Sequence, residues 1–267
     1  MDGETSIPIE GVTFQLSKMD GTQIGTAETD AQGIATFSNL YPGTYQLKET
    51  LTNSNYILNS ETFEIVVEYN KTTVKTITNY LKKGNIKINK TDSDSSQAIE
   101  GVTFELLDLK GNVISTATTN ENGEAYFNNL QIGKYRLKEV ATKQNYVLNN
   151  SIFEVEVEYN KTTMKEITNE YKKGNLIVHK VDKDNHKIPL GNVIFDLFSN
   201  EFKRVIGSYA TDVNGRIIIN NLRIGEYRLI EKETGKWYEL TEDKVLNIAW
   251  NETTELLLEN ELKKGQV

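Results

Sequence analysis

A repeat of roughly 90 residues runs through the whole chain and limits the folds that it can adopt. The segment Ile9–Phe14 recurs unchanged as Ile99–Phe104, and it returns in a looser form as Leu190–Phe195. Sequence similarity at a fixed spacing is typical of tandem structural units, and this spacing matches the size of a small domain. The predicted units are module one (residues 1–81), module two (82–171), module three (172–262) and the start of a further repeat (263–267).

Each module has the pattern of an all-β domain. Short runs such as Phe153–Val157 alternate apolar and polar residues, and turn signals separate such runs about every 8–12 residues. Asn120–Gly123 is typical of a turn in which glycine supplies a positive φ, whereas Asn70-Lys71 and Asn160-Lys161 are expected to form hairpin turns. About seven strands per module predict a two-sheet sandwich, and junctions without a Pro- or Ser-rich linker predict an end-to-end rod.

Three polar residues of module two, Lys90, Glu139 and Asn169, fall where a strand points toward the core. Each comes two positions after an apolar residue, and successive side chains of a strand alternate between faces. An amine, a carboxyl and a carboxamide that are buried together are costly unless they pair or react. We therefore expect these three groups to meet in the core.

The other two modules repeat this set to different extents. Module three has Lys180, Glu231 and Asn260 at the corresponding positions. Module one keeps Glu49 and Asn79, but its sequence starts after the position of the lysine strand. The pair in module one is thus an orphan, and we expect an incomplete sandwich whose open edge invites strand addition from another chain.

The buried set suggests a covalent reaction. Burial lowers the pKa of a lysine and raises that of a carboxyl, so a neutral Lys90 could attack the Asn169 carboxamide. A protonated Glu139 would polarise that carboxamide and carry protons while ammonia leaves. The product, an isopeptide bond, would remove the buried charge and tie the first strand to the last. The alternative is a buried Lys–Glu ion pair beside a hydrogen-bonded asparagine, and the strand pattern alone leaves both open.

The sequence resembles the Cna B-type, or SpaA-like prealbumin-fold, modules of Gram-positive surface proteins and pilins. The resemblance covers the whole chain and rests on a Lys-x-Asp, a Gly-x-Tyr-x-Leu-x-Glu run and a closing Asn. These stand at Lys90–Asp92 and Lys180–Asp182, at Gly43–Glu49, Gly133–Glu139 and Gly225–Glu231, and at Asn79, Asn169 and Asn260. It implies Lys–Asn isopeptide bonds in modules two and three, with Glu139 and Glu231 as catalysts. Ala141-Thr142 departs from the Ala-Pro that the family often has after the glutamate.

The resemblance implies a structural stalk segment of a Gram-positive cell-surface adhesin or pilin-like protein. Such a segment would lie outside the cell at the wall, with its secretion signal and anchor outside this chain, which is expected to be a piece of a longer array. Its partners would be neighbouring repeats, and host matrix or glycan through regions that this chain lacks. No enzymatic activity beyond the autocatalytic bond is expected.

Composition agrees with these expectations. The net charge is −8, with 38 acidic against 30 basic residues, which argues against a nucleic-acid partner. No apolar run reaches the roughly 18 residues of a membrane span. The two histidines, His179 and His186, are too few for a metal site, so neither a metal nor another cofactor is expected.

Three rival functions stay open. A ligand-binding adhesin would show an exposed aromatic patch in one module, for which Trp237-Tyr238 is the candidate. A hydrolase of the transthyretin-like type would need clustered His and Arg in an open site, which two histidines on one short segment do not supply. An accessory carbohydrate-binding array of a larger secreted enzyme cannot be separated from a stalk by this sequence.

Overall fold

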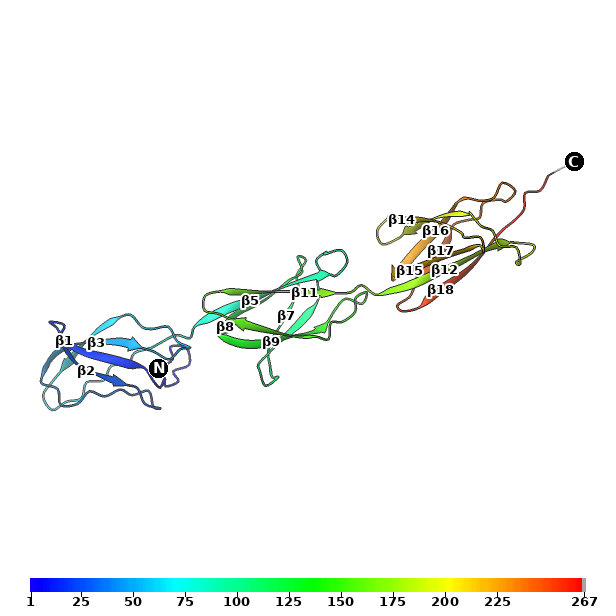
Figure 1. The fold of residues 1–267 in the computed structure, drawn as a ribbon. Coiled ribbons are helices and arrows are strands. Elements are labelled where there is room, and N and C mark those ends of the chain that lie inside the picture. The colour runs from blue at the N-terminus through cyan, green and yellow to red at the C-terminus, as the bar shows by residue number, and fades with distance from the viewer. Residues whose placement is uncertain (266–267) are drawn as a thin grey trace.

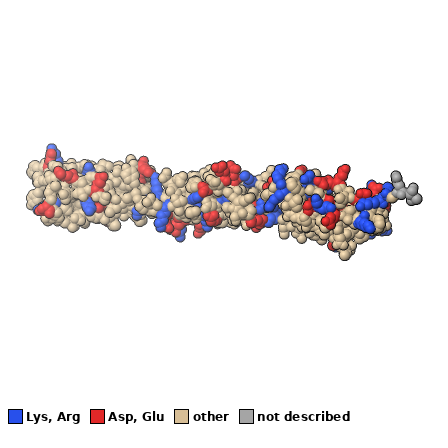
Figure 2. All heavy atoms as spheres, turned by 90° about the horizontal axis from the view of Figure 1, so that it is seen from above, with Lys and Arg blue, Asp and Glu red and all other residues tan. Residues whose placement is uncertain are grey.

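The protein is an all-β rod, as predicted. The computed structural model describes residues 1–265, and the three modules follow one another along one axis (Figure 1). Acidic and basic side chains are interspersed along the rod (Figure 2). Across the described residues, no helix has the length and hydrophobicity that crossing a membrane requires.

Module two is a sandwich of two sheets built from seven strands. A three-stranded sheet has the order β11-β5-β8, and a four-stranded sheet has the order β10-β9-β6-β7. The first and last strands of the module are neighbours and run parallel. The strands are β5 (Lys83–Asp92), β6 (Thr103–Leu107), β7 (Val113–Thr118), β8 (Glu124–Gln131), β9 (Gly133–Ala141), β10 (Ile152–Val157) and β11 (Thr162–Asn169).

Module three repeats this topology. Its sheets have the orders β15-β12-β18 and β14-β13-β16-β17, again with the first and last strands parallel. The strands are β12 (Lys173–Asp182), β13 (Ile194–Ser199), β14 (Arg204–Ala210), β15 (Arg216–Arg223), β16 (Gly225–Glu233), β17 (Lys244–Ile248) and β18 (Thr253–Asn260). Of the predicted further repeat at 263–267, the last two residues lie outside the described part of the chain.

Module one forms only one sheet among the described residues. Its order is β2-β1-β3-β4, from β1 (Thr13–Lys18), β2 (Gln23–Glu28), β3 (Gly43–Leu51) and β4 (Thr62–Val67). Residues 34–41 and 72–79, which match β8 and β11, are not strands. Three buried apolar residues form its core, against fourteen in module two and thirteen in module three. The sandwich is therefore open on the side where the other modules have their first strand.

The turns at Asn70-Lys71 and Asn160-Lys161 are present, but they do not close hairpins. Asn160 adopts a positive φ of 55°, as expected for a tight turn. The strands on either side of it, β10 and β11, belong to different sheets. The hairpin prediction was wrong because alternation along two adjacent runs does not reveal whether they pair with each other or pack face to face.

Gly84, at the start of β5, is required by space rather than by its backbone conformation. An added Cβ would lie 2.2 Å from the Glu158 carbonyl oxygen. At Gly174 of module three, an added Cβ would lie at the same distance from the Ala249 carbonyl oxygen. In both modules the loop before the last strand crosses over the first strand at this glycine.

We expect Gly84→Ala to lower the free energy of unfolding of module two by about 1–3 kcal/mol, because the crossing loop must move. Denaturant unfolding of the variant measures this loss. Gly25→Ala is the control, since an added Cβ there meets nothing within 4 Å. Equal stability of the two variants would show that the loop over Gly84 can move without a cost in the free energy of unfolding.

Candidate functional site

The predicted polar set of module two comes together between the two sheets. Lys90 lies on β5 and Asn169 on β11 in one sheet, and Glu139 lies on β9 in the other. Their exposed fractions are 0%, 2% and 1%. The strand pattern places them there because each continues an inward-facing apolar row, and the parallel pairing of β5 with β11 brings the lysine and the asparagine to the same end.

The contacts in module two place each reacting group beside its partner. Lys90 Nζ donates to Asn169 Oδ1 at 2.5 Å and lies 3.0 Å from Glu139 Oε2. Asn169 Nδ2 donates to Glu139 Oε1 at 2.6 Å. The amine is thus next to the amide carbonyl that it would attack, and the nitrogen that would leave is next to the carboxyl that would protonate it.

Module three assembles the same cluster in a slightly different arrangement. Lys180 Nζ lies 3.1 Å from Glu231 Oε2, and Asn260 Nδ2 donates to Glu231 Oε1 at 2.7 Å. Asn260 Oδ1 is buried and accepts no hydrogen bond. The lysine therefore contacts the carboxylate, and the carbonyl of the asparagine stays available to it.

Module one holds the two remaining members without an amine. Asn79 Nδ2 donates to Glu49 Oε1 at 2.7 Å and to the Ile57 carbonyl at 2.9 Å. Glu49 is 0% exposed, and its Oε2 has no hydrogen-bond partner. The structure thus shows the orphan pair in the same geometry as in the other modules.

Burial shifts the ionisation of the lysines in the direction that favours a nucleophile. Burial lowers the pKa of both Lys90 and Lys180, and the facing glutamates oppose that shift only in part. The expected rise for a buried carboxyl does not hold at Glu231. Burial does raise its pKa, but hydrogen bonds from Thr241 and Asn260, together with the Lys180 charge, outweigh burial and lower it. In module three, the pKa values of the lysine and of the facing glutamate are therefore both lowered.

Threonine is the member of the cluster that sequence reasoning missed. Thr142 Oγ1 accepts from Asn169 Nδ2 at 3.0 Å, and Thr234 Oγ1 accepts from Asn260 Nδ2 at 2.7 Å. In all three modules a threonine follows the glutamate by three positions, as Thr52 does in module one. This recurring Glu-x-x-Thr was a visible signal. The threonine holds the amide nitrogen against the carboxyl, so it positions the leaving group.

The aspartate of the Lys-x-Asp motif has a structural role. Asp92 Oδ1 accepts from the backbone N–H groups of Asp94 and Ser95 at 2.9 and 2.8 Å, which shapes the turn after β5. Its Oδ2 accepts from Tyr146 at 3.0 Å. Arg223 of module three reaches back to Asp92 at 3.0 Å. Asp92 therefore fixes the turn at the end of the lysine strand and also links this strand to module three.

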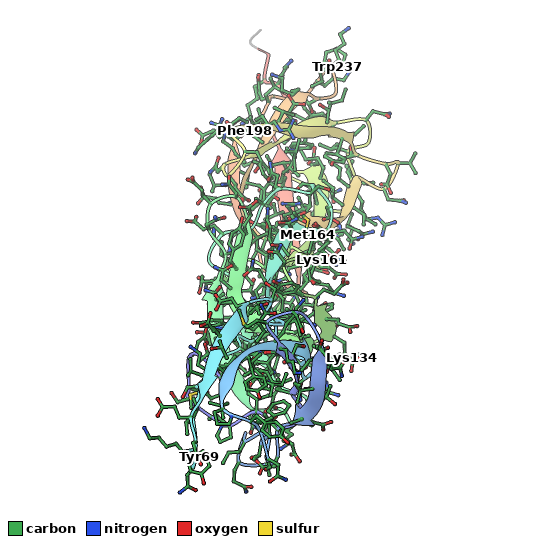
Figure 3. The ribbon with its side chains drawn as sticks, turned by 90° about the vertical axis from the view of Figure 1, so that its left-hand side faces the viewer. Tyr69, Lys134, Lys161, Met164, Phe198 and Trp237 are labelled. Atoms are coloured by element: carbon green, nitrogen blue, oxygen red, sulfur yellow. The ribbon has the colours of Figure 1, made fainter. Side chains whose placement is uncertain are left out.

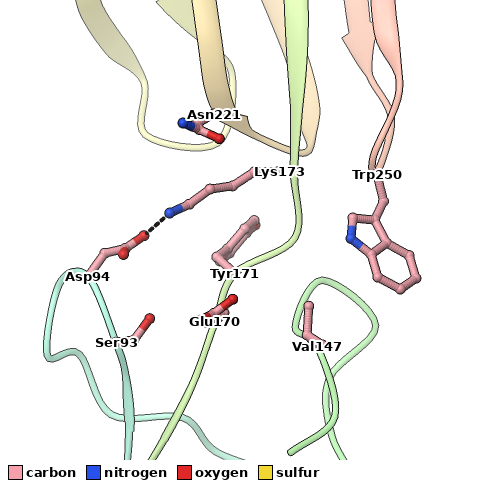
Figure 4. Close-up of a pocket in the computed structure, with 8 residues that line it drawn as sticks. All are labelled: Ser93, Asp94, Val147, Glu170, Tyr171, Lys173, Asn221 and Trp250. Carbon is pink, nitrogen blue, oxygen red and sulfur yellow. Dashed lines mark ion pairs between the residues drawn. The ribbon is translucent and has the colours of Figure 1, made fainter.

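The junction of modules two and three is tightly connected. Lys173 pairs with Asp94 at 2.7 Å across the joint, beside Tyr171 and Trp250 (Figure 4). The corresponding pair at the first joint is Lys83 with Glu4, also at 2.7 Å. A hollow lies at the joint between modules two and three, and Asp94, Tyr171 and Trp250 are among the residues that line it. None of the residues of the Lys–Glu–Asn clusters lines this hollow.

The histidines do not meet in one site. His179 is half-buried on the side of β12 opposite Lys180, and the exposed His186 lies 2.6 Å from Glu259. No group of three or more metal-binding side chains is found within residues 1–265.

The fold and the cluster define a class of protein: a tandem array of two-sheet β-sandwiches whose polar core joins the first and last strands. The three modules match the family described as the SpaA prealbumin-like fold domain, over residues 1–81, 84–171 and 174–262. The chain belongs to this family, as the resemblance implied.

Individual relatives agree with the family match. The chain is 28% identical to the serine-aspartate repeat-containing protein D of Staphylococcus aureus in an alignment 270 residues long, and this alignment covers 85% of this chain and 20% of that protein. It is 32% identical to the serine-aspartate repeat-containing protein F of Staphylococcus epidermidis in an alignment 149 residues long, and this alignment covers 48% of this chain and 9% of the relative. The chain thus spans a fifth or less of these relatives.

Among solved structures, the Bacillus anthracis TIE protein is similar, with a TM-score of 0.84 and 25% identity. The match covers 97% of this chain and 49% of that one. The long arrangement of three modules is therefore found in another protein. The staphylococcal relatives are named as repeat-containing proteins, which agrees with the prediction that the chain is not an enzyme.

Proposed function

We propose that the chain is a stalk segment of a Gram-positive cell-surface adhesin or pilin-like protein, stabilised by isopeptide bonds Lys90–Asn169 and Lys180–Asn260. The observation that carries this proposal is the buried cluster that links the first and last strands of modules two and three. The similarity to staphylococcal repeat-containing proteins supports a location at the cell surface. The rod shape supports a role in display at a distance (Figure 1).

The bond would resist force because of where it lies. Stretching the rod pulls on the start of β5 and the end of β11, which are parallel neighbours. A covalent link from Lys90 to Asn169 would pass the load directly from one strand to the other. The part of the chain between these two residues, which are 79 positions apart, would then carry no force. The short, ion-paired joints would transmit that load from module to module.

The chemistry would use the carboxyl as a proton relay. Glu139 takes a proton from the Lys90 ammonium, and the neutral amine attacks Asn169 Cγ. The new Nζ–Cγ bond forms, the Cγ–Nδ2 bond breaks, and the carboxyl returns its proton to Nδ2, which leaves as ammonia. The second proton lost by Nζ stays on the carboxyl or leaves with ammonia as ammonium. The buried ion pair becomes a neutral amide, which lowers the cost of burial.

Intact mass spectrometry tests the proposal. Because each bond releases one ammonia, the full chain should weigh less than its sequence by two ammonias, and peptide mapping should join Lys90 to Asn169 and Lys180 to Asn260. A chain of full sequence mass would establish the alternative, in which the lysines are held as buried ion pairs.

The rival binding function receives no comparable support. Trp237 is 67% exposed, but Tyr238 donates to Asp182 at 2.9 Å and so serves the turn after β12. Tyr69 is another highly exposed aromatic residue. It lies in module one, at the opposite end of the molecule from Trp237 in module three, so the two side chains do not form one patch (Figure 3). The candidate pair thus separates into one structural tyrosine and one exposed tryptophan.

A further inference from the structure

The residue ten positions after the glutamate of the cluster differs between the modules. It is an asparagine in modules one and two and a threonine in module three, at Asn59, Asn149 and Thr241. Each lies in the loop that follows the strand of the glutamate, which is β3, β9 or β16. The clusters of modules two and three otherwise contain the same residue types, so this loop residue is a chemical difference between two matched sites.

In module two, the loop asparagine does not touch the carboxyl oxygen that faces the lysine. Asn149 donates its backbone N–H to Glu139 Oε1 at 3.4 Å, and its side chain donates to the Thr168 carbonyl at 3.2 Å. Glu139 Oε2 accepts no hydrogen bond from residues 1–265 and lies 3.0 Å from Lys90 Nζ. This oxygen is therefore held by the charge of the lysine alone.

In module three, the loop threonine binds the oxygen that faces the lysine. Thr241 donates to Glu231 Oε2 through its hydroxyl and also through its backbone N–H, the latter at 3.2 Å. Lys180 Nζ donates to the same oxygen at 3.1 Å. Three donors thus converge on one carboxyl oxygen, and hydrogen bonds of this kind favour the charged carboxylate over the neutral acid.

The groups around Glu231 favour the same charged form. Lys180 faces it from β12 and Asn260 from β18, and its partner on the neighbouring strand β13 is the apolar Phe195. Burial raises the pKa of Glu231, but the loop threonine, the asparagine and the lysine charge together lower it. Burial lowers the pKa of Lys180, and the charges of Glu231 and Glu259 oppose that shift in part.

The position of the amine differs between the two modules in the same sense. Lys90 Nζ donates to Asn169 Oδ1 at 2.5 Å, so this amine already contacts the carbonyl that it would attack. Asn260 Oδ1 accepts no hydrogen bond from the described part of the chain, and Lys180 Nζ contacts the carboxylate instead. The amine of module three must therefore leave a more strongly held carboxylate before it can react.

We propose that Thr241 is a positioning residue that slows bond formation in module three, relative to module two, by holding Glu231 as a carboxylate. This inference rests on the proposed isopeptide chemistry. Glu231 takes a proton from the Lys180 ammonium, Nζ attacks Asn260 Cγ, and the Cγ–Nδ2 bond breaks. The carboxyl returns its proton to Nδ2, which leaves as ammonia, and the second proton lost by Nζ stays on the carboxyl or leaves with ammonia as ammonium. The threonine opposes the first step, because a carboxylate that keeps its hydrogen bonds accepts a proton less readily.

The order of bond formation within one chain tests this proposal. Full chain is made by cell-free synthesis, collected in urea before it folds, and diluted into buffer, and samples taken over time are analysed by intact mass and peptide mapping. We expect the intermediate that is short by one ammonia to carry the Lys90–Asn169 link. A hydrogen bond to a charged group corresponds to a rate difference of about 10–100-fold between the modules.

Exchanging the loop residues isolates the hydroxyl. Thr241→Val should speed bond formation in module three by about 10–100-fold, and Thr241→Ser should restore the slow rate. Asn149→Thr should slow the bond of module two, and the unaltered module of each variant is the internal control. Thr241→Asn, which introduces the residue of modules one and two, gives a second fast variant if valine disturbs folding.

The pH profile separates this role from packing. Below the pKa of Glu231 the carboxyl and the lysine are both protonated, so the amine stays charged and bond formation slows. Because the Thr241 hydroxyl lowers that pKa, the decline in rate should occur at lower pH in the unmodified chain than in Thr241→Val, by about one to two pH units. A threonine that only fills space would leave the decline at the same pH.

The outcomes also separate this inference from the proposed function. If the chain loses two ammonias but Thr241→Val keeps the native rate and pH profile, the role of Thr241 is overturned while the bonds stand. A Thr241→Val chain that folds and never closes module three overturns that role as well, since the threonine would then be required for the bond. A chain that keeps its full sequence mass overturns the proposed function, and the role of Thr241 with it.

Discussion

Replacing Lys90 by methionine is expected to lower the thermal unfolding midpoint of module two by roughly 20 °C. A bond between residues 79 positions apart would constrain the unfolded chain, and a link of this span contributes about 4 kcal/mol. Methionine keeps most of the apolar volume beside Phe104, so lost packing adds little. Calorimetry of the full chain measures the shift, and limited proteolysis should show cleavage confined to module two.

Two further variants isolate the effect of the bond. Lys87→Met lies on the same strand but on the outer face, where the lysine pairs with Glu124 at partial exposure, and it should change stability by less than about 1 kcal/mol. Adding Glu139→Gln to Lys90→Met removes the unpaired buried carboxyl. If this double variant melts with the Lys87→Met protein, the bond makes no contribution to stability.

The strand pattern was enough to predict the cluster because a buried row has a strict period of two. Lys90 and Glu139 could be assigned to the core from their neighbours in sequence alone. Whether they meet depends on how the two sheets pack, which the strand pattern does not show. The only indication from the sequence was that the same three residue types recur together in module three. The residues alone left open both an isopeptide bond and a buried ion pair, and the family resemblance favoured the bond.

Other features depended on contacts that sequence spacing does not encode. The crossing of the chain between sheets at Asn160 cannot be read from two alternating runs, since paired and stacked strands share that pattern. Arg223 pairs with Asp92 of the preceding module, and the corresponding position in module two is Gln131. The second joint thus gains an ionic contact through one residue difference. From the sequence, Thr142 was noted only as part of a departure from the Ala-Pro of the family, because its role depends on the position of the Asn169 amide nitrogen.

Module one shows what the first strand contributes. Its described sheet has the same order as its counterparts, with Phe14 still buried at 8% exposure. Without a central strand, however, residues 34–41 and 72–79 lose their ladder partners and are not strands. The buried apolar core shrinks accordingly. The lysine strand is therefore the element around which the smaller sheet of each sandwich is organised.

Replacing Glu139 by glutamine is expected to leave module two without its bond while module three still reacts. Glutamine has nearly the same shape, so the core should keep its packing, but it cannot accept the lysine proton or return one to Asn169 Nδ2. Loss of such a relay slows a reaction by about 10²–10⁴-fold. The intact mass of freshly purified Glu139→Gln protein should therefore be short by one ammonia rather than two.

The complementary variants make the assignment specific. Glu231→Gln should also lose one bond, and the double variant should have the full sequence mass. Glu124→Gln, which removes the partly exposed carboxyl beside Lys87, should remain short by two ammonias. A Glu139→Gln chain that forms both bonds at the rate of the unmodified protein would show that the carboxyl only holds the asparagine in place. Proton transfer would then have to pass through another group, and Thr142, the other side chain in contact with Asn169 Nδ2, would become the next residue to replace.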